Sequence, residues 1–210
     1  MIRKLIGCAL MSYFIGSINP SQILGKMHGH DMRKEGSKNA GASNAYILIG
    51  KSAFFIVAAS DIFKAWLCWK LTAYFVPEAV FSGVFGGFFC TLGHMFPVFM
   101  GFHGGKGFAC LGGMIMGFSP WLFIIQLGIA LAVFFLLKYL VFATIFSSAL
   151  FTGIYWYFTR DITGTGILAL MTVMISLKHR ENFKRMKEGK EATSRYLGHA
   201  DEELKRMGYK

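Results

Sequence analysis

Residues 120–137 read PWLFIIQLGIALAVFFLL, a continuous stretch without a single charge. A helix crosses the roughly 30 Å hydrocarbon layer of a bilayer with about 20 apolar residues, so this stretch predicts a membrane-spanning helix. Further apolar runs of similar length lie near residues 5–24, 53–76, 79–97, 139–158 and 162–178. The sequence therefore predicts an all-α polytopic membrane protein.

The composition excludes an ordinary soluble domain. Of the 210 residues, 54% are hydrophobic and 16% are charged, whereas about 25% of a soluble domain is charged. The basic excess, 22 Lys and Arg against 11 Asp and Glu, lies at the ends of the apolar runs. It indicates topology signals and contacts with anionic ligands, not nucleic-acid binding. Neither a metal site nor a disulfide framework is expected, because the cysteines stand singly in apolar stretches, at Cys8, Cys68, Cys90 and Cys110.

One apolar stretch is too short to span a bilayer alone. Residues 107–118 read GFACLGGMIMGF, which indicates a half-helix buried against protein that begins just after Gly104-Gly105. Together with the long runs it gives about seven transmembrane helices, one of them short and broken. Residues 1–180 then form a single integral membrane domain, and residues 181–210 form a short basic cytoplasmic tail.

The positions of Lys and Arg predict the orientation in the membrane. Basic residues lie between the first two spans, after the third span, after the fifth span and in the tail, whereas the turns near residues 77–78, 119–120 and 160–161 are nearly neutral. Seven crossings with the N-terminus outside and the C-terminus in the cytoplasm satisfy these loops, with Arg3 and Lys4 as the exception. We therefore expect a multi-pass protein of the cell (inner) membrane whose polar loops face the cytoplasm.

The loop between the first two spans carries the first polar constellation. Residues 31–44 read DMRKEGSKNAGASN, in which small residues alternate with hydrogen-bonding side chains. A solvated connector would explain the polarity but not Gly36 and Gly41 on either side of Ser37 and Asn39. Such a segment offers donors to a phosphate or carbonyl oxygen and allows close approach of the backbone.

The second constellation, residues 93–107, reads GHMFPVFMGFHGGKG and follows the third span. Glycines ahead of a helix N-terminus expose N–H groups at the positive end of the helix dipole, and Lys106 beside them completes an anion cradle. The stretch is not a Walker sequence, because Lys106 is followed by Gly107 and Phe108. Glycines that merely permit close helix packing are the alternative, and they leave Lys106 unexplained.

The third constellation, KHRENFKR at residues 178–185, lies at the end of the last span. Most of its basic residues are typical of lipid-headgroup anchors. His179 and Asn182, three positions apart, share a helix face and can point back under the bundle.

The fourth constellation is the pair Asp61 and Lys64 inside the second span. Charges within a membrane are costly and usually functional. The two residues can neutralise each other as a structural strut or contact a substrate, and the sequence leaves both interpretations open.

In this order and spacing the motifs resemble those of the bacterial acyl-phosphate:glycerol-3-phosphate acyltransferases, the PlsY family. The resemblance rests on residues 16–20 with Lys26, on residues 31–44, on Asp61 with Lys64, on residues 93–107, and on His179 and Asn182 with Gly189 and Glu191. It implies transfer of a fatty acyl group from acyl phosphate to the sn-1 hydroxyl of glycerol-3-phosphate. The products are lysophosphatidate, in the first acylation of phospholipid synthesis, and inorganic phosphate. The resemblance implies no cofactor and no metal, membrane lipid as the surroundings, and no particular oligomeric state.

The resemblance also implies roles for individual residues. The catalytic set is Ser37, Lys106, His179 and Asn182. The expected substrate-binding residues are Lys38, Asn39, Asn44, Gly104, Gly105, Gly107 and Lys138. Asp61, Lys64 and Glu191 are expected to be structural, and Glu191 would close the site by pairing with a basic neighbour.

Three positions depart from the family pattern. Ile47 stands where the family has a functional arginine, Lys38 replaces a glycine beside the essential serine, and Val141 replaces a serine. Losing an arginine from a site that binds two dianions costs several kcal/mol unless another cation replaces it. We expect Lys38 to be that replacement.

Two alternatives to an active acyltransferase follow from the same residues. A diverged paralogue would keep the fold but use another acceptor or no catalysis, and would act as a lipid-binding or partner protein. A transporter would use the broken helix and the Asp61–Lys64 pair, but the sequence lacks the long internal repeat typical of that class.

Overall fold

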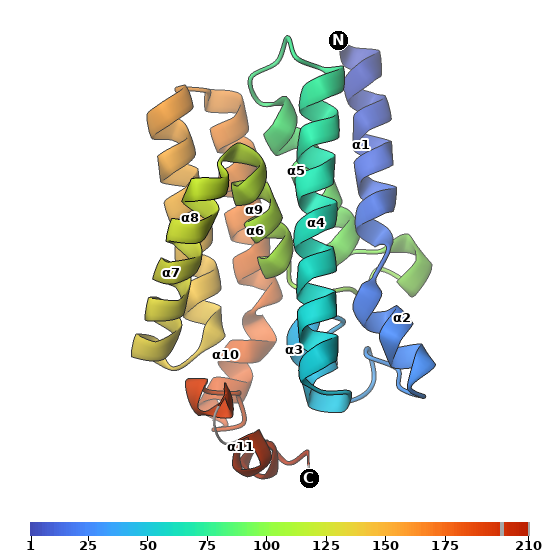
Figure 1. Ribbon diagram of the computed structural model, residues 1–210, viewed down its shortest axis with the longest axis vertical. Helices are drawn as coiled ribbons and strands as arrows, with labels where there is room; N and C mark the ends of the chain where they lie inside the picture. The colour runs from blue at the N-terminus through green and yellow to red at the C-terminus, as the bar shows by residue number, and fades with distance from the viewer. Residues whose placement is uncertain (198–199, 210) are drawn as a thin grey trace.

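The computed structural model describes residues 1–197 and 200–209, and every regular element within them is a helix. In chain order these are α1 (Ile2–Ser17), α2 (Pro20–Met27), α3 (Ala42–Leu48), α4 (Lys51–Phe75), α5 (Ser82–Met95), η1 (Val98–Met100), α6 (Phe108–Phe118), α7 (Pro120–Leu137), α8 (Leu140–Thr159), α9 (Ile162–Lys178), α10 (Arg180–Lys187), η2 (Ser194–Leu197) and α11 (Ala200–Met207). The helices α1 and α4 to α9 lie along the long axis of the molecule (Figure 1).

Within the described residues, five helical segments are long and apolar enough to cross a membrane. They are α4, α5 continued through η1, α7, α8, and α9 continued through α10. The remaining two long-axis helices are shorter, with 16 residues in α1 and 11 in α6. The predicted all-α membrane class is confirmed, and the predicted half-helix is α6.

The first apolar run is not one helix, so the prediction of a continuous helix over residues 5–24 is wrong. α1 ends at Ser17, Ile18 is extended with ψ 117°, and α2 begins at Pro20. Asn19 caps α2, because its side-chain oxygen accepts a hydrogen bond of 2.7 Å from the amide of Gln22. The proline at the first helical position has no N–H to continue α1, so the chain starts a new helix there.

Small residues bring the backbones of the central helices into contact. A Cβ atom on Gly16 of α1 would collide with the carbonyl of Cys90 in α5, and a Cβ atom on Gly113 of α6 would collide with the carbonyl of Ile62 in α4. Such close approach is how helices associate in lipid, where no hydrophobic effect drives them together. The core around these contacts consists of Ala65, Cys68, Trp69, Val84, Cys90, Cys110, Leu111, Met114, Ile115, Phe151, Tyr155, Leu168, Met171 and Ile175.

A buried ion pair holds the broken end of α1 in the bundle. The ammonium of Lys64 lies 2.7 Å from a carboxylate oxygen of Asp61, its neighbour on α4. It also donates hydrogen bonds of 3.0 Å and 2.9 Å to the carbonyls of Gly16 and Ile18. Carbonyls at a helix end lack an intrahelical partner, and lipid offers none. The Asp61–Lys64 pair therefore lies where a structural strut is required.

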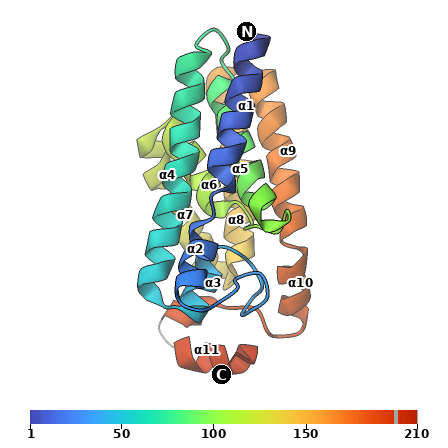
Figure 2. The ribbon, with the colours of Figure 1, turned by 90° about the vertical axis from the view of Figure 1, so that its right-hand side faces the viewer.

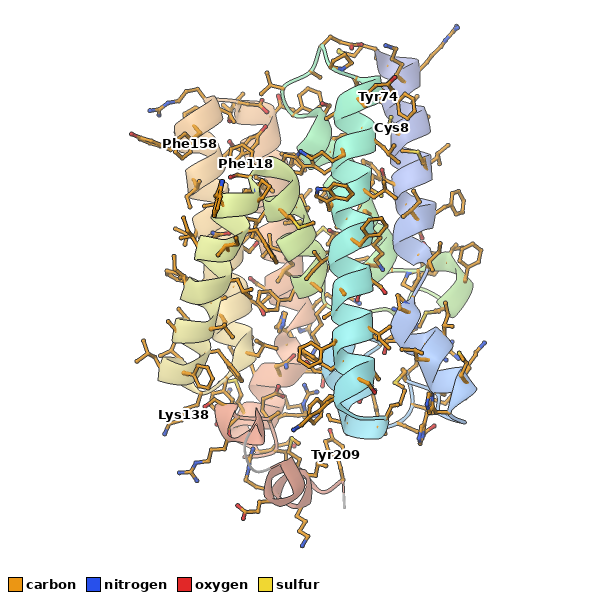
Figure 3. The ribbon with its side chains drawn as sticks, in the orientation of Figure 1. Cys8, Tyr74, Phe118, Lys138, Phe158 and Tyr209 are labelled. Carbon is orange, nitrogen blue, oxygen red and sulfur yellow. The ribbon has the colours of Figure 1, made fainter. Side chains whose placement is uncertain are left out.

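Most of the polar loops gather at one end of the molecule. The chain termini lie at opposite ends, and α2, α3, α10 and α11 surround the end that carries the C-terminus (Figure 2). Lys138 and Tyr209 lie toward that end, whereas Tyr74 and Phe158 lie toward the other (Figure 3). The loop between α2 and α3 and the tail after α10 thus share one end of the fold.

Candidate active site

Asn44 organises the loop that contains Ser37. Its side-chain oxygen accepts hydrogen bonds from the amide (2.8 Å) and the hydroxyl (3.1 Å) of Ser37. Its side-chain nitrogen donates to the carbonyls of Met32 (3.0 Å) and Glu35 (3.1 Å). Asn44 is fully buried, so the structure gives it an architectural place where the sequence indicated contact with substrate.

The start of α2 anchors the same loop through two residues outside the predicted site, Asn19 and Gln22. Asn19 donates a hydrogen bond of 3.0 Å to the carbonyl of Ala40. Gln22 donates to Asp31 (3.1 Å) and accepts from the amide of Met32 (3.0 Å). The signal that could have revealed them is the Asn-Pro pair, which predicts a helix start beside the loop.

Arg33 ties the loop to η1. Its guanidinium grips the carboxylate of Asp31 with two hydrogen bonds of 3.0 Å and 2.9 Å, and it also reaches the carbonyl of Met100. The hydrogen bonds from Arg33 hold the pKa of Asp31 well below its usual range. Met32, Ala40 and Met100 form one buried apolar cluster, so the Ser37 loop and the approach to Lys106 are packed together.

The three candidate site residues Ser37, Lys38 and Asn39 remain accessible in this loop. The side chains of Ser37 and Asn39 are half-buried, and Lys38 is exposed. Lys38 has φ 57°, a left-handed conformation that favours glycine over residues with a Cβ atom. This explains why a glycine suits the position, and it fixes the turn from which the exposed Lys38 side chain extends.

Gly104 and Gly105 lie in close packing, and their amides already have partners in the protein. The amide of Gly104 donates to the carbonyl of Met95 (3.3 Å), and the amide of Gly105 donates to that of His94 (3.0 Å). A Cβ atom on Gly104 would collide with the His94 carbonyl, and one on Gly105 with the His94 imidazole. The sequence could not reveal this, because the acceptors come from the tertiary fold of the preceding helix end. The two glycines fix the path of the chain that leads to Lys106.

Lys106 is hydrogen-bonded to a residue of α10. Its ammonium donates a hydrogen bond to the side-chain oxygen of Asn182, which is buried at the start of α10. The Asn182 amide nitrogen donates in turn to Glu191 (2.7 Å), and the other carboxylate oxygen of Glu191 accepts from Arg185 (2.7 Å). Glu191 therefore pairs with a basic neighbour in the way its expected structural role requires.

Burial lowers the pKa of Lys106 to about 8, and the positive charge of Arg185 lowers it further in the same direction. A lysine with such a pKa is mostly protonated at neutral pH, and the protein does not fully neutralise its positive charge. Lys106 also stands just before Phe108, where α6 begins with its positive dipole end. The position thus favours an anion.

His179 lies one helical turn from Asn182, where α9 passes into α10. It is buried, and its Nδ1 lies 2.8 Å from the carbonyl of Ile175. A carbonyl only accepts, so Nδ1 carries the hydrogen and Nε2 of the neutral ring keeps a free lone pair. The ring can therefore accept a proton from a hydroxyl group.

Lys138 and Ile47 lie apart from these contacts. Lys138 forms the turn between α7 and α8 and lines a cavity with Arg195 and Arg206. Ile47 of α3 packs against apolar residues of the tail. Neither residue is among the contacts described for Lys106.

Asp61, His94 and Cys110 have their ligating atoms within 4.8 Å of one another. The Lys64 ammonium lies between them, 2.7 Å from Asp61 and 3.1 Å from His94 Nδ1. A cation of the protein already neutralises the carboxylate, so the geometry favours a structural cluster over a metal site.

Comparison with known proteins agrees with this geometry. The family described as "Glycerol-3-phosphate acyltransferase" matches residues 6–189. The chain belongs to the glycerol-3-phosphate acyltransferase family. The glycerol-3-phosphate acyltransferase of Bacillus subtilis (strain 168) is 38% identical over 181 residues, which cover 84% of this chain and 91% of the relative. That of Desulfotalea psychrophila is 35% identical over 191 residues, covering 87% and 94%.

Solved structures of the glycerol-3-phosphate acyltransferase family share the fold. The crystal structure of PlsY, an integral membrane glycerol 3-phosphate acyltransferase, in its glycerol 3-phosphate form, matches with a TM-score of 0.84 and 28% identity, and the match covers 92% of this chain and 97% of the other. The lysophosphatidic acid form matches with a TM-score of 0.80 and 25% identity. Membership of this family makes the chain an integral-membrane enzyme of the acyltransferase class, and the comparisons give no support to a non-catalytic lipid-binding or partner protein.

Proposed function

We propose that this enzyme transfers a fatty acyl group from acyl phosphate to the sn-1 hydroxyl of glycerol-3-phosphate, giving lysophosphatidate and inorganic phosphate. Family membership supports the reaction class. The observation that carries the assignment to this site is the hydrogen bond between Lys106 and Asn182, one turn from the free nitrogen of His179.

An acyl phosphate is a mixed anhydride with a good leaving group, so no covalent enzyme intermediate is needed. The protein has to bind two phosphate groups, keep the acyl chain in lipid and orient the alcohol. Lys106 and the N-terminal end of α6 hold the phosphate group of glycerol-3-phosphate. Gly107, with φ +90°, lets the chain turn from Lys106 into that helix.

His179 acts as the general base for the acceptor. Its Nε2 takes the proton of the sn-1 hydroxyl while the oxygen attacks the carbonyl carbon of the acyl phosphate. The carbon–oxygen bond to the phosphate breaks, and inorganic phosphate leaves with the electron pair. Asn182 holds the Lys106 ammonium near His179 through their hydrogen bond.

The Ser37 loop binds the donor. The Ser37 hydroxyl orients the acyl carbonyl or the attacking hydroxyl, and its own orientation is set by Asn44. Asn39 and Lys38 offer an amide and a cation to the second phosphate group. Lys138 is a more distant cation at the same end of the fold, which attracts the anionic substrates.

The enzyme crosses the inner membrane seven times, with the N-terminus outside and the site facing the cytoplasm. The loop between α2 and α3 and the tail after α10, which are rich in Lys and Arg, lie at the end of the fold opposite the N-terminus (Figure 2), and this supports the orientation. Single cysteines introduced at Ser37, Lys106 and Lys187, in a chain lacking the native four, should all react with reagents supplied from the cytoplasmic side.

Purified enzyme in detergent, given acyl phosphate and a panel of acceptor alcohols, tests the reaction directly. Phosphate release and lysophosphatidate formation that depend on glycerol-3-phosphate are the expected result. Turnover only with a different acceptor would replace the substrate, and no turnover with any acceptor would favour the diverged paralogue.

A further inference from the structure

The C-terminal helix α11 lies across the same end of the fold as the active site. Figure 1 and Figure 2 both place it at the end of the molecule that carries α3 and α10. The family match ends at residue 189, so α11 belongs to a segment outside the region shared with the family.

The described side chains of α11 divide into an apolar and a polar face. Leu204 and Met207, three positions apart, are buried with 7% and 6% of their surface exposed. Glu202, Lys205 and Arg206 are exposed. A helix with this division uses the apolar face for docking.

The docking surface of α11 includes the position where the family resemblance places an arginine. Leu204 and Met207 pack against Tyr46 and Ile47 of α3 and against Ala192. The isoleucine at position 47 therefore contributes apolar surface to the contact with α11. An arginine at position 47 would bury less apolar surface against this helix.

The other face of α11 holds the segment that carries Glu191. Arg206 donates hydrogen bonds to the backbone carbonyls of Gly189 and Glu191. Tyr209, just after the helix, interacts electrostatically with Arg185 and Glu191, and burial raises its pKa. The carboxylate of Glu191 holds Asn182, which holds Lys106.

We infer that α11 is a latch that positions the anion-binding lysine, with Arg206 as its positioning residue. The latch contacts α3, which follows the Ser37 loop, and the 189–191 segment, which holds Asn182 and Lys106. It therefore connects the Ser37 side of the site to the Lys106 side. Arg206 acts through Glu191 and Asn182 and does not touch substrate. The inference rests on the proposed function, because its kinetic effect is measured in that reaction.

The docking can be tested without any activity. In a chain lacking the four native cysteines, the pair Ile47→Cys and Leu204→Cys should be joined by a short bifunctional thiol reagent in membranes. The control pair, Ile47→Cys with Glu202→Cys, carries its second thiol on the exposed face and should be joined far less. Equal joining of both pairs, or of neither, would overturn the latch, whatever reaction the enzyme catalyses.

The positioning role of Arg206 is tested by measuring how its substitution changes KM and kcat separately. Arg206→Ala should raise the KM for glycerol-3-phosphate by roughly tenfold, as expected for the loss of hydrogen bonds from a charged donor, with a smaller change in kcat. Arg206→Lys should recover part of the loss, and Lys205→Ala on the exposed face should match the wild type. An unchanged KM in Arg206→Ala, while the wild type turns over, would overturn the inference. An inactive wild type would instead count against the proposed function and leave the cross-linking result to decide the latch.

Discussion

The ammonium of Lys106 donates a hydrogen bond to the side-chain oxygen of Asn182, which lies 76 positions later in the chain. The nitrogen of the same amide donates to Glu191. One neutral side chain thus holds a cation on one side and a carboxylate on the other. It keeps the two charges from pairing directly, so the Lys106 ammonium stays available to an anionic ligand.

Asn182→Ala should therefore lower kcat/KM for glycerol-3-phosphate. Losing a hydrogen bond to a charged group costs about 1.5–3 kcal/mol, which corresponds to a fall of roughly 10- to 100-fold. Initial rates with varied glycerol-3-phosphate measure this. Lys184→Ala, exposed on the same helix, is the matched control, and equal kcat/KM in the two variants would show that Lys106 does not depend on Asn182.

The rate should also depend on pH through Lys106. With a pKa of about 8, the ammonium is charged below that pH and loses its charge as the pH rises through it. The KM for glycerol-3-phosphate should therefore rise above about pH 8. Lys106→Arg keeps its charge, because a guanidinium has a pKa above about 12, so this variant should lack the alkaline rise in KM. A rise at the same pH in both proteins would assign the titration to another group.

The helices and the site differ in how far the sequence could predict them. Apolar runs such as residues 120–137 are long and uncharged, so hydropathy alone places α7. The same criterion does not find the break at Asn19, because a short polar stretch hardly changes the average hydropathy over a long window. The partners of Gly105 and Ile47 were also missed, since His94 and the α11 residues meet them only in the folded chain. Local patterns therefore predicted the elements and the motifs, whereas tertiary packing decided which atoms remain free for a ligand.

Alanine at Gly104 or Gly105 should displace the turn that carries Lys106. At Gly104 the added methyl group meets the backbone of His94 and the ring of Pro97, whereas at Gly105 it meets the His94 side chain. Backbone yields less than a side chain, so Gly104→Ala should reduce kcat/KM more than Gly105→Ala does.

The control for these glycine variants is Gly128→Ala on α7, because a methyl group there meets nothing within 4 Å. It should keep both activity and thermal stability. Activity equal to wild type in Gly104→Ala would show that the position of Lys106 does not depend on this turn.

Lys64→Met should destabilise the fold, because it removes the ammonium that pairs with the buried Asp61 carboxylate and that donates to the carbonyls of Gly16 and Ile18. Removing one member of a buried ion pair costs about 3–5 kcal/mol. The double variant Asp61→Asn with Lys64→Met removes both charges and should recover part of that loss. Thermal unfolding in detergent measures both, with Lys51→Ala, exposed at the start of α4, as the control. A double variant less stable than Lys64→Met would contradict the strut.

Lys38 and Ile47 provide the test most specific to this chain. Because Lys38 has φ 57°, Lys38→Gly relieves a conformational cost of about 1 kcal/mol and should not lower the unfolding temperature. Any loss of activity then reports the lost charge. We expect Lys38→Gly to abolish or strongly reduce acyl transfer.

Adding Ile47→Arg to Lys38→Gly should restore part of the activity by returning a cation to the position where the family resemblance places one. The aliphatic stem of the arginine can keep some contact with Leu204 and Met207. The two substitutions should therefore be strongly non-additive in kcat/KM, as is expected of residues that serve one ligand. If Lys38→Gly is harmless in an active enzyme, the compensation is wrong, and the second phosphate group must be held by other cations, with Arg33 and Lys138 the next to substitute.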